Sequence, residues 1–188
     1  MNFVHETSIV EEGAQIGDGT KIWHFCHVMP SAKIGDKSQF GQNCFIDNNV
    51  IIGNNVKVQN NVSIYNGVII EDDVFIGPSV VFTNVLNPRA FIEQKQNFRS
   101  TLVAKGATIG ANATIVCGVT LGAYCFIGAG AVVTREVKPF AMITGNPGIQ
   151  TGWVDKRGQK LTLIKNTATD IFGNTYSEVN GNLIFKEL

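Results

Sequence analysis

Large apolar residues recur at every sixth position along most of this chain. The register holds without exception from Val4 to Phe82, breaks once, and resumes from Val103 to Val133. The residues that occupy it are Val4, Val10, Ile16, Ile22, Val28, Ile34, Phe40, Ile46, Ile52, Val58, Ile64, Ile70, Ile76, Phe82, Val103, Ile109, Ile115, Leu121, Ile127 and Val133. With 44% of the residues apolar, chance would produce such a series about once in ten million sequences, so the repeat reports a repeated structure.

A second pattern follows each of these apolar positions. Four residues later the chain has a small or β-branched residue, such as Ala32, Ser38 or Val56, and a glycine often comes directly after the apolar residue. A period of six matches neither an α-helix nor a plain hairpin, but it matches a short strand followed by a tight turn. Three such units close one coil of eighteen residues. We therefore predict an all-β fold, a parallel β-helix of six or seven coils that stack at about 4.8 Å to a height of about 30 Å.

The one break in the repeat predicts a long external loop. The anchors Phe82 and Val103 are separated by twenty-one positions, where six would keep the register. Residues 83–102 should therefore leave the prism, and loops of this length inside a compact fold are usually functional or disordered. The segment mixes Phe91 and Phe98 with basic residues, which favours docking onto a neighbouring surface over free disorder.

The repeat also divides the chain. We predict a β-helix domain over residues 1–147 and a C-terminal extension over residues 148–188, where the hexads have stopped. Within the extension, Lys160–Leu163 and Thr175–Val179 are candidate strands, and Asn180–Gly181 is typical of a β-hairpin turn. The extension should cover the open end of the prism, because uncovered strand edges promote aggregation.

Composition excludes several classes of partner. Fifteen Lys and Arg residues balance fifteen Asp and Glu residues, which argues against nucleic acid. No apolar run approaches the ~20 residues of a membrane helix. Residues 1–12 do not resemble a signal peptide, so we expect no membrane partner and a cytoplasmic location. Four scattered cysteines lack zinc-ligand spacing and are expected to be buried thiols, with no metal bound.

Residues eighteen apart lie one above the other in a β-helix, and this rule locates candidate chemistry. The interior is filled by the anchors, so a site must lie outside, and a deep one needs a second subunit. Asn48, Asn66 and Asn84 line one corner, and Cys117 and Arg135 continue the column if the loop replaces a single corner connection. The alternative interpretation is that corner asparagines merely tolerate left-handed backbone. Asn84 is the strongest candidate, because it lies at the root of the loop.

The hexads resemble those of the hexapeptide-repeat acyltransferases over residues 4 to about 137. This resemblance implies acyl transfer from a coenzyme A thioester.

The three histidines are His5, His24 and His27. Histidine is the usual base near neutral pH, yet His24 lies just over three coils from Asn84, roughly 16 Å along the prism. We expect His24 either to contact the far end of a long substrate or to be a plain corner residue. If the acceptor is a sugar amine, the enzyme can act by positioning it against a thioester and offering a backbone N–H to the oxyanion.

The C-terminal hexads are candidates for coenzyme binding. Gly128 and Ala129 give a shallow surface on which a pantetheine arm can lie. Arg135 with Lys138, or alternatively the pair Lys156 and Arg157, could contact the coenzyme phosphates.

The resemblance to the hexapeptide-repeat acyltransferases also has implications for the fold and the assembly. This resemblance implies a left-handed prism, a homotrimer with its sites in the grooves between prisms, and an acyl-coenzyme A donor. A different acceptor amine or hydroxyl, a γ-type carbonic anhydrase and a non-catalytic structural β-helix are the alternatives. The histidine placement disfavours the anhydrase, and a structural β-helix should have no large loop.

Several polar segments that the prism does not require narrow the resemblance. They are Ile22–Phe25 with His27–Val28, Gly41–Asn43, Val58–Asn61, Val81–Val85 with Asn87–Arg89, Gly145–Pro147 and Gly152–Val154. Together they resemble the N-acetyltransferases of nucleotide-linked 3-amino sugars, either the UDP-2-acetamido-3-amino-2,3-dideoxyglucuronate or the dTDP-3-amino-3,6-dideoxyhexose type.

This second resemblance implies acetyl-CoA as donor and a role in surface-polysaccharide (lipopolysaccharide O-antigen) biosynthesis. It implies a catalytic position for Asn84. The residues expected to bind the substrate are His24, Tyr65, Asn66, Asn87 and Arg89, and those expected to bind the coenzyme are Gly128, Ala129, Arg135, Asn146 and Pro147. Some relatives carry an acid where this chain has Asn66, and the amide here favours a mechanism led by the substrate amine.

Overall fold

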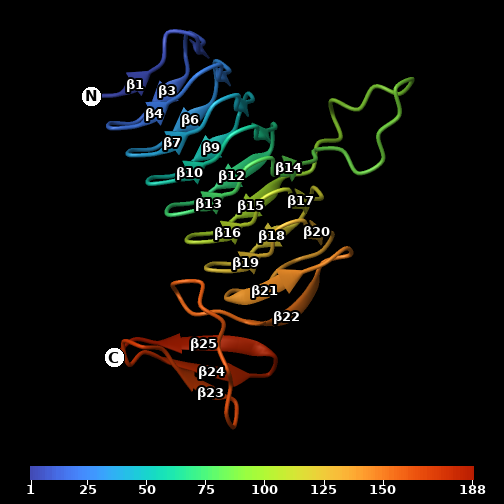
Figure 1. The fold of residues 1–188 in the computed structure, drawn as a ribbon. Helices are drawn as coiled ribbons and strands as arrows, with labels where there is room; N and C mark the ends of the chain where they lie inside the picture. The colour runs from blue at the N-terminus through green and yellow to red at the C-terminus, as the bar shows by residue number, and fades with distance from the viewer.

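The computed structural model describes residues 1–188, which form β-strands and connecting turns without a helix (Figure 1). Sheet A contains β1 (Phe3–Val4), β4 (Lys21–Ile22), β7 (Gln39–Phe40), β10 (Lys57–Val58), β13 (Phe75–Ile76), β16 (Thr108–Ile109), β19 (Phe126–Ile127), β21 (Ala141–Thr144) and β22 (Ile149–Trp153). Sheet B contains β2 (Ile9–Val10), β5 (His27–Val28), β8 (Phe45–Ile46), β11 (Ser63–Ile64), β14 (Val81–Phe82), β17 (Thr114–Ile115) and β20 (Val132–Val133). Sheet C contains β3 (Gln15–Ile16), β6 (Lys33–Ile34), β9 (Ile51–Ile52), β12 (Val68–Ile70), β15 (Thr101–Val103) and β18 (Thr120–Leu121). The predicted parallel β-helix is therefore confirmed.

Each short strand places one residue inside the prism and one outside. In β7 the anchor Phe40 is fully buried and Gln39 is exposed, as period-two alternation requires. Val58 of β10 stacks directly on Phe40, eighteen residues earlier in the chain. The anchors and the small residues beside them form one core that runs the length of the prism.

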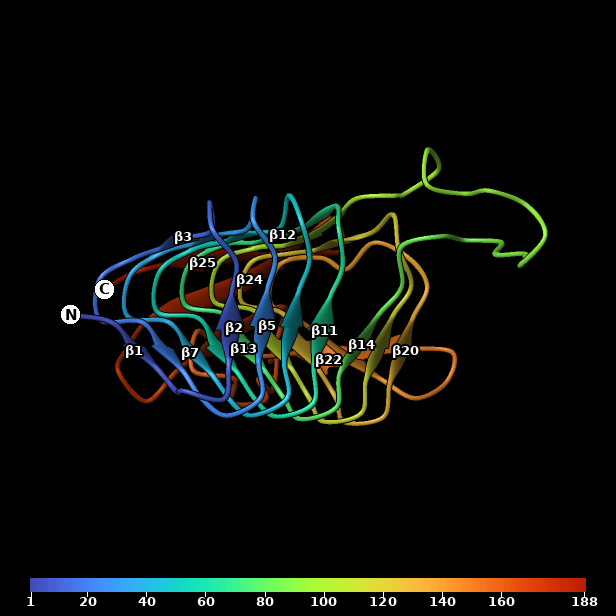
Figure 2. The ribbon, with the colours of Figure 1, turned by 90° about the horizontal axis from the view of Figure 1, so that it is seen from above.

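The loop leaves the prism from sheet B and returns in sheet C. Across it the register is 33 residues, because Val81 pairs with Thr114, so the loop adds fifteen residues to an ordinary coil. The Arg99 N–H donates to the Asn84 carbonyl at 2.9 Å and closes the root of the loop. Thr101 already pairs with Val68, so the loop spans residues 83–100 and the predicted end at Leu102 was two residues too late. Figures 1 and 2 both show it projecting away from the coils.

The prism is longer than predicted. Sheet A contains eight parallel strands, one more than the six or seven coils expected, because β21 pairs with β19 beyond the last hexad. Strand β22 then turns back antiparallel to β21 and extends sheet A to Trp153. The predicted boundary at residue 147 stays a prediction. No helix of the chain is long and apolar enough to cross a bilayer.

A separate antiparallel sheet follows at the end of the stack opposite the N-terminus (Figure 1). It contains β23 (Thr167–Thr169), β24 (Thr175–Val179) and β25 (Asn182–Lys186), and the predicted hairpin at Asn180–Gly181 is confirmed. The expected strand at Lys160–Leu163 was wrong, because that segment makes only a single bridge, between Lys160 and Val154. The sheet contributes Leu183 and Tyr176 to the core and so covers the prism end.

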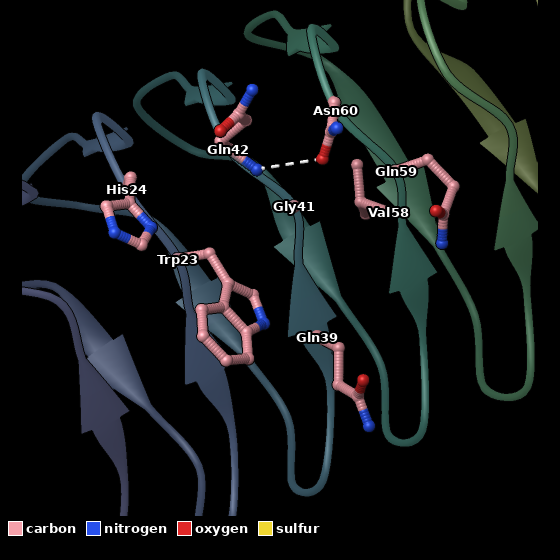
Figure 3. Close-up of a pocket in the computed structure, with 8 residues that line it drawn as sticks. All are labelled: Trp23, His24, Gln39, Gly41, Gln42, Val58, Gln59 and Asn60. Carbon is pink, nitrogen blue, oxygen red and sulfur yellow. Dashed lines mark hydrogen bonds between the residues drawn. The ribbon is translucent and has the colours of Figure 1, made fainter.

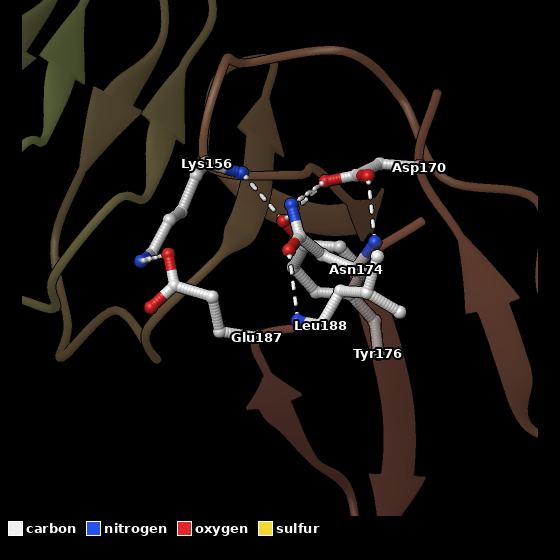
Figure 4. A network of polar contacts seen from close by, with 6 residues as sticks. All are labelled: Lys156, Asp170, Asn174, Tyr176, Glu187 and Leu188. Atoms are coloured by element: carbon white, nitrogen blue, oxygen red, sulfur yellow. Dashed lines mark hydrogen bonds and ion pairs between the residues drawn. The ribbon is translucent and has the colours of Figure 1, made fainter. Parts of the chain in front are cut away.

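Tyr176 anchors this cap. Its ring is fully buried against Phe140, with ring centroids 5.8 Å apart. Its hydroxyl accepts the Lys156 N–H at 3.1 Å and donates to the Asp170 carboxylate at 3.3 Å (Figure 4). Burial raises the pKa of Tyr176. Burial also acts to raise the pKa of Asp170, but hydrogen bonds led by those from Asn174 outweigh it and lower that pKa, so the carboxylate stays ionised.

We expect Tyr176→Ala to reduce the free energy of unfolding by about 3–5 kcal/mol, because it removes a buried ring and leaves a cavity at the prism end. Equilibrium denaturation in urea measures the change. Tyr65→Ala is the matched control, since the ring of Tyr65 is partly exposed and its loss should cost less than about 1 kcal/mol. Equal effects of the two substitutions would contradict a capping role for Tyr176.

Candidate functional site

The three sheets meet at three corners, and two of these carry the predicted site residues. The corner that joins sheets A and B contains His24 and is called the His24 corner. The corner that joins sheets B and C contains Asn84 and is called the Asn84 corner. Each corner runs the length of the prism, because coils stack in register.

The Asn84 corner has the predicted column. The 33-residue register across the loop places Cys117 one coil after Asn84, toward the C-terminal end of the prism, and Arg135 one coil further. Left-handed backbone does not explain these asparagines, since the positive φ angles belong to neighbours such as Asn49, at 58°. The amide of Asn48 is used by Ser31, at 3.0 Å. The side chains of Asn66 and Asn84 make no hydrogen bond within the chain, although both are half-buried, so they are available to a ligand.

Asp47 also lies in this corner, although it was not predicted from the sequence as a site residue. Its carboxylate accepts the Asn48 N–H at 2.7 Å and the Asn66 N–H at 3.2 Å. It lies one coil below Tyr65, in the register set by β8 and β11. The stacking rule places it there, but nothing in the sequence indicates that its carboxylate turns toward the Asn66 backbone. Asp47 therefore places a carboxylate directly beside Asn66.

The loop adds further polar groups at this corner. Asn87 and Arg89 are exposed, and the Arg89 guanidinium donates to the Pro88 carbonyl at 3.0 Å. The two arms of the loop enclose a cavity of about 480 Å³ that Asn87 lines together with Phe98. Phe91 is 85% exposed at the far end of the loop, so its ring has no partner within the chain.

The His24 corner carries a separate polar groove. Its volume is about 340 Å³, and Trp23, His24, Gln42 and Asn60 are among the residues that line it (Figure 3). Sheet B lies between this groove and the Asn84 corner. One copy of the chain therefore does not bring His24 and Asn84 together.

The coenzyme candidates also divide between corners. Gly128 and Ala129 lie near the C-terminal end of the His24 corner, where a side chain on Gly128 would meet Thr144 at 3.1 Å. Asn146 and Pro147 lie in the turn that follows β21, at the C-terminal end of this corner.

Arg135 lies on the Asn84 corner instead. With Lys138 and Gly148–Gln150 it lines a cavity of about 270 Å³. The alternative pair is engaged in the cap, since Lys156 lies 4.0 Å from the Phe185 ring centroid and Arg157 lies 3.9 Å from that of Phe172.

All four thiols are buried, as predicted. Cys26, Cys44 and Cys125 belong to the core of the prism, and Cys117 is buried at the Asn84 corner. The Cys26 thiol donates to the Gly41 carbonyl at 3.0 Å, and the Cys44 thiol to the Gln59 carbonyl at 3.2 Å. Burial raises the pKa of Cys125 to about 12, which disfavours its nucleophilic thiolate. The chain contains no group of three or more His, Cys, Asp or Glu residues placed to hold a metal ion.

Comparison with known proteins agrees with this architecture. The family model "Bacterial transferase hexapeptide (six repeats)" matches residues 13–48, 49–84 and 100–135, which together are more than half of the chain. The gap between the last two matches is the external loop.

One relative matches nearly end to end. The dTDP-3-amino-3,6-dideoxy-alpha-D-galactopyranose 3-N-acetyltransferase of Aneurinibacillus thermoaerophilus is 46% identical over 184 residues, which cover 95% of this chain and 92% of that one. This confirms the predicted resemblance to the N-acetyltransferases of nucleotide-linked 3-amino sugars.

Two solved structures share the fold at low sequence identity. The acetyltransferase domain of PglB from Neisseria gonorrhoeae, in complex with acetyl coenzyme A, has a TM-score of 0.58 and 21% identity and covers 67% of this chain and 54% of that one. A mutant GDP-perosamine N-acetyl transferase from Caulobacter crescentus, in complex with CoA and GDP-perosamine, has a TM-score of 0.55 and 18% identity and covers 80% of this chain and 56% of that one. The chain thus spans just over half the length of each. With the family model and the long match to the Aneurinibacillus enzyme, these results show that the chain belongs to the bacterial hexapeptide transferases.

Proposed function

We propose that this protein transfers acetyl from acetyl-CoA to the 3-amino group of a nucleotide-linked amino sugar. The observation that carries this is the 46% identity with a dTDP-3-amino-sugar 3-N-acetyltransferase, which extends over 95% of the chain and includes the segments outside the hexads. A dTDP-linked 3-amino-3,6-dideoxyhexose is the favoured acceptor, and a UDP-linked 3-amino uronate is the second candidate. The product would serve surface-polysaccharide biosynthesis in the cytoplasm.

The Asn84 corner supports the chemistry. In the transfer, the neutral amine attacks the thioester carbonyl carbon, the N–C bond forms, and the C–S bond breaks. The amine nitrogen loses one proton, and the coenzyme sulfur gains one. Asn84 offers a free amide that can hold the amine or the developing oxyanion. The half-buried Asp47 carboxylate, beside Asn66 and two coils below Asn84, adds a fixed negative charge to the same corner. No histidine of the same copy lies at this corner, and we propose that the substrate amine itself leads the reaction.

The arrangement of the corners supports a homotrimer. His24 and Asn84 lie on different corners of one prism, and a groove between two copies can place the His24 corner of one against the Asn84 corner of the next. The loop carries Phe91, Ile92 and Phe98 on an exposed projection, as expected of a segment that packs on a neighbouring copy. In that assembly Tyr65, Asn66, Asn87 and Arg89 would border the sugar. The residues proposed to border the coenzyme are Gly128, Ala129, Arg135, Asn146 and Pro147.

A panel of acceptors tests the proposal. We expect purified protein with acetyl-CoA to release free thiol when given dTDP- or UDP-linked 3-amino sugars, and the product mass should rise by one acetyl group. The matched control is the same nucleotide sugar with a 3-hydroxyl, which should release no thiol above background. Thiol release with the hydroxyl sugar alone, or with no acceptor in the panel, would contradict the proposal.

A further inference from the structure

Four aromatic rings gather on the first two coils at the His24 corner. The Phe3 ring packs on Trp23 with centroids 5.2 Å apart, and the His5 ring stacks on His24 with centroids 3.5 Å apart. The first coil therefore supports the rings of the second coil from one side. Trp23 is nevertheless 43% exposed, so a large part of the indole remains open.

The rings of Trp23 and His24 are stacked. Their planes are parallel within 8°, and their centroids lie 6.3 Å apart. Trp23 takes the place in its coil that Gly41 takes in the next one, because Ile22 pairs with Phe40. Gly41 has no side chain to cover the indole. The result is a supported aromatic surface that a planar group can approach.

The rest of the groove is lined by uncharged amides. Gln39, Gln42, Gln59 and Asn60 lie on the next two coils, to one side of the rings (Figure 3). The Asn60 oxygen accepts the Gln42 backbone N–H at 3.0 Å, which fixes that side chain. The three glutamine side chains make no hydrogen bond within the chain, so their donors and acceptors are free. Such amides match the alternating C=O and N–H groups on the edge of a nucleobase.

Two lysines lie beside the groove on sheet A. Lys21 and Lys57 flank Gln39 in the register of β4, β7 and β10, and neither forms an ion pair within the chain. Their ammonium groups suit phosphates next to a stacked base. The combination of a flat aromatic surface, free amides and adjacent unpaired cations is the chemistry that a nucleoside diphosphate needs.

We propose that the groove of Trp23, His24, Gln39, Gln42, Gln59 and Asn60 binds the base of a nucleoside diphosphate, with the base stacked on Trp23. The inference rests on the proposed function in that this nucleotide is the handle of the amino-sugar substrate. It adds a residue, Trp23, to the predicted contact His24, and it assigns the groove to recognition and not to the acetyl-transfer step.

Intrinsic fluorescence tests the stacking directly, because the chain has two tryptophans and Trp153 is only 7% exposed. We expect dTDP and UDP, without any sugar, to quench the emission of the full-length protein in a saturable way. Trp23→Phe should abolish the quenching, and the matched control Trp153→Phe should retain it. Undiminished quenching in Trp23→Phe, or quenching by a methyl glycoside and not by dTDP or UDP, would overturn the proposal.

Kinetics supply the second test. Trp23→Ala should raise KM for the nucleotide sugar about tenfold or more, as the loss of a stacked base implies, while kcat changes less than about twofold. A fall in kcat with unchanged KM would overturn the assignment to recognition. The two proposals can be contradicted separately. Quenching by dTDP without acetyl transfer to any amine would support the nucleotide groove and contradict the proposed acetyltransferase function. Acetyl transfer with an unchanged KM in Trp23→Ala would support the function and contradict the nucleotide groove.

Discussion

Asn84→Ala is expected to lower kcat about a hundredfold, because it removes a free amide at the point where we place the reacting groups. The substitution should leave the fold intact. The Asn84 backbone carbonyl still accepts the Arg99 N–H that closes the loop, and Asn84 has no left-handed backbone that alanine would strain. Thiol release under saturating acetyl-CoA and nucleotide sugar measures kcat, and size-exclusion chromatography with light scattering checks that assembly is unchanged.

The matched control for Asn84 is another amide. Asn182→Ala removes an exposed asparagine from the C-terminal sheet, which is part of neither corner, and should retain the wild-type kcat. A kcat within about twofold of wild type in Asn84→Ala would remove this residue from the mechanism. A raised KM with unchanged kcat would make it a binding residue that contributes equally to the ground state and the transition state.

The sequence predicted the prism well because the hexads alone determine which residues point inward. Val58 must stack on Phe40 if eighteen residues make a coil, and it does. The final coil escaped prediction for a physical reason. Ile143 pairs with Ile127 at a distance of sixteen residues, so the chain takes a shorter path there and leaves the six-residue register.

The candidate site was only partly predictable. The column through Asn84, Cys117 and Arg135 followed from spacing, because the loop replaces one corner connection. The role of Asp47 did not, since a hydrogen bond to the Asn66 N–H depends on how one side chain turns at a corner. The split of the coenzyme candidates Gly128 and Arg135 between two corners also follows from spacing, because one comes after a strand of sheet A and the other after a strand of sheet B. How separate copies would bring these corners together is not encoded in the pattern of a single chain.

Removing the loop should separate fold from function. Deleting residues 85–99 removes the fifteen extra residues and joins Asn84 to Ser100, so that Val103 falls six positions after Phe82. Thr101 then takes the small interior position four residues after Phe82, where it is already buried. The shortened chain keeps every hexad and also Asn84. We therefore expect it to fold, with a Tm within about 4 °C of wild type.

Acetyl transfer by this variant should nevertheless fall more than about a hundredfold, because the loop supplies Asn87, Arg89 and the apolar residues that we propose contact a neighbouring copy and position the groove. Light scattering tells the two contributions apart. Loss of the trimer would assign the effect to Phe91 and its neighbours, whereas an intact trimer without activity would assign it to the polar residues of the loop. Alanine at both Lys95 and Gln96, on the loop but outside these groups, is the control and should keep both properties. If the deletion variant were fully active, the loop residues would have no part in the reaction, since the variant keeps Asn84 but lacks Asn87 and Arg89.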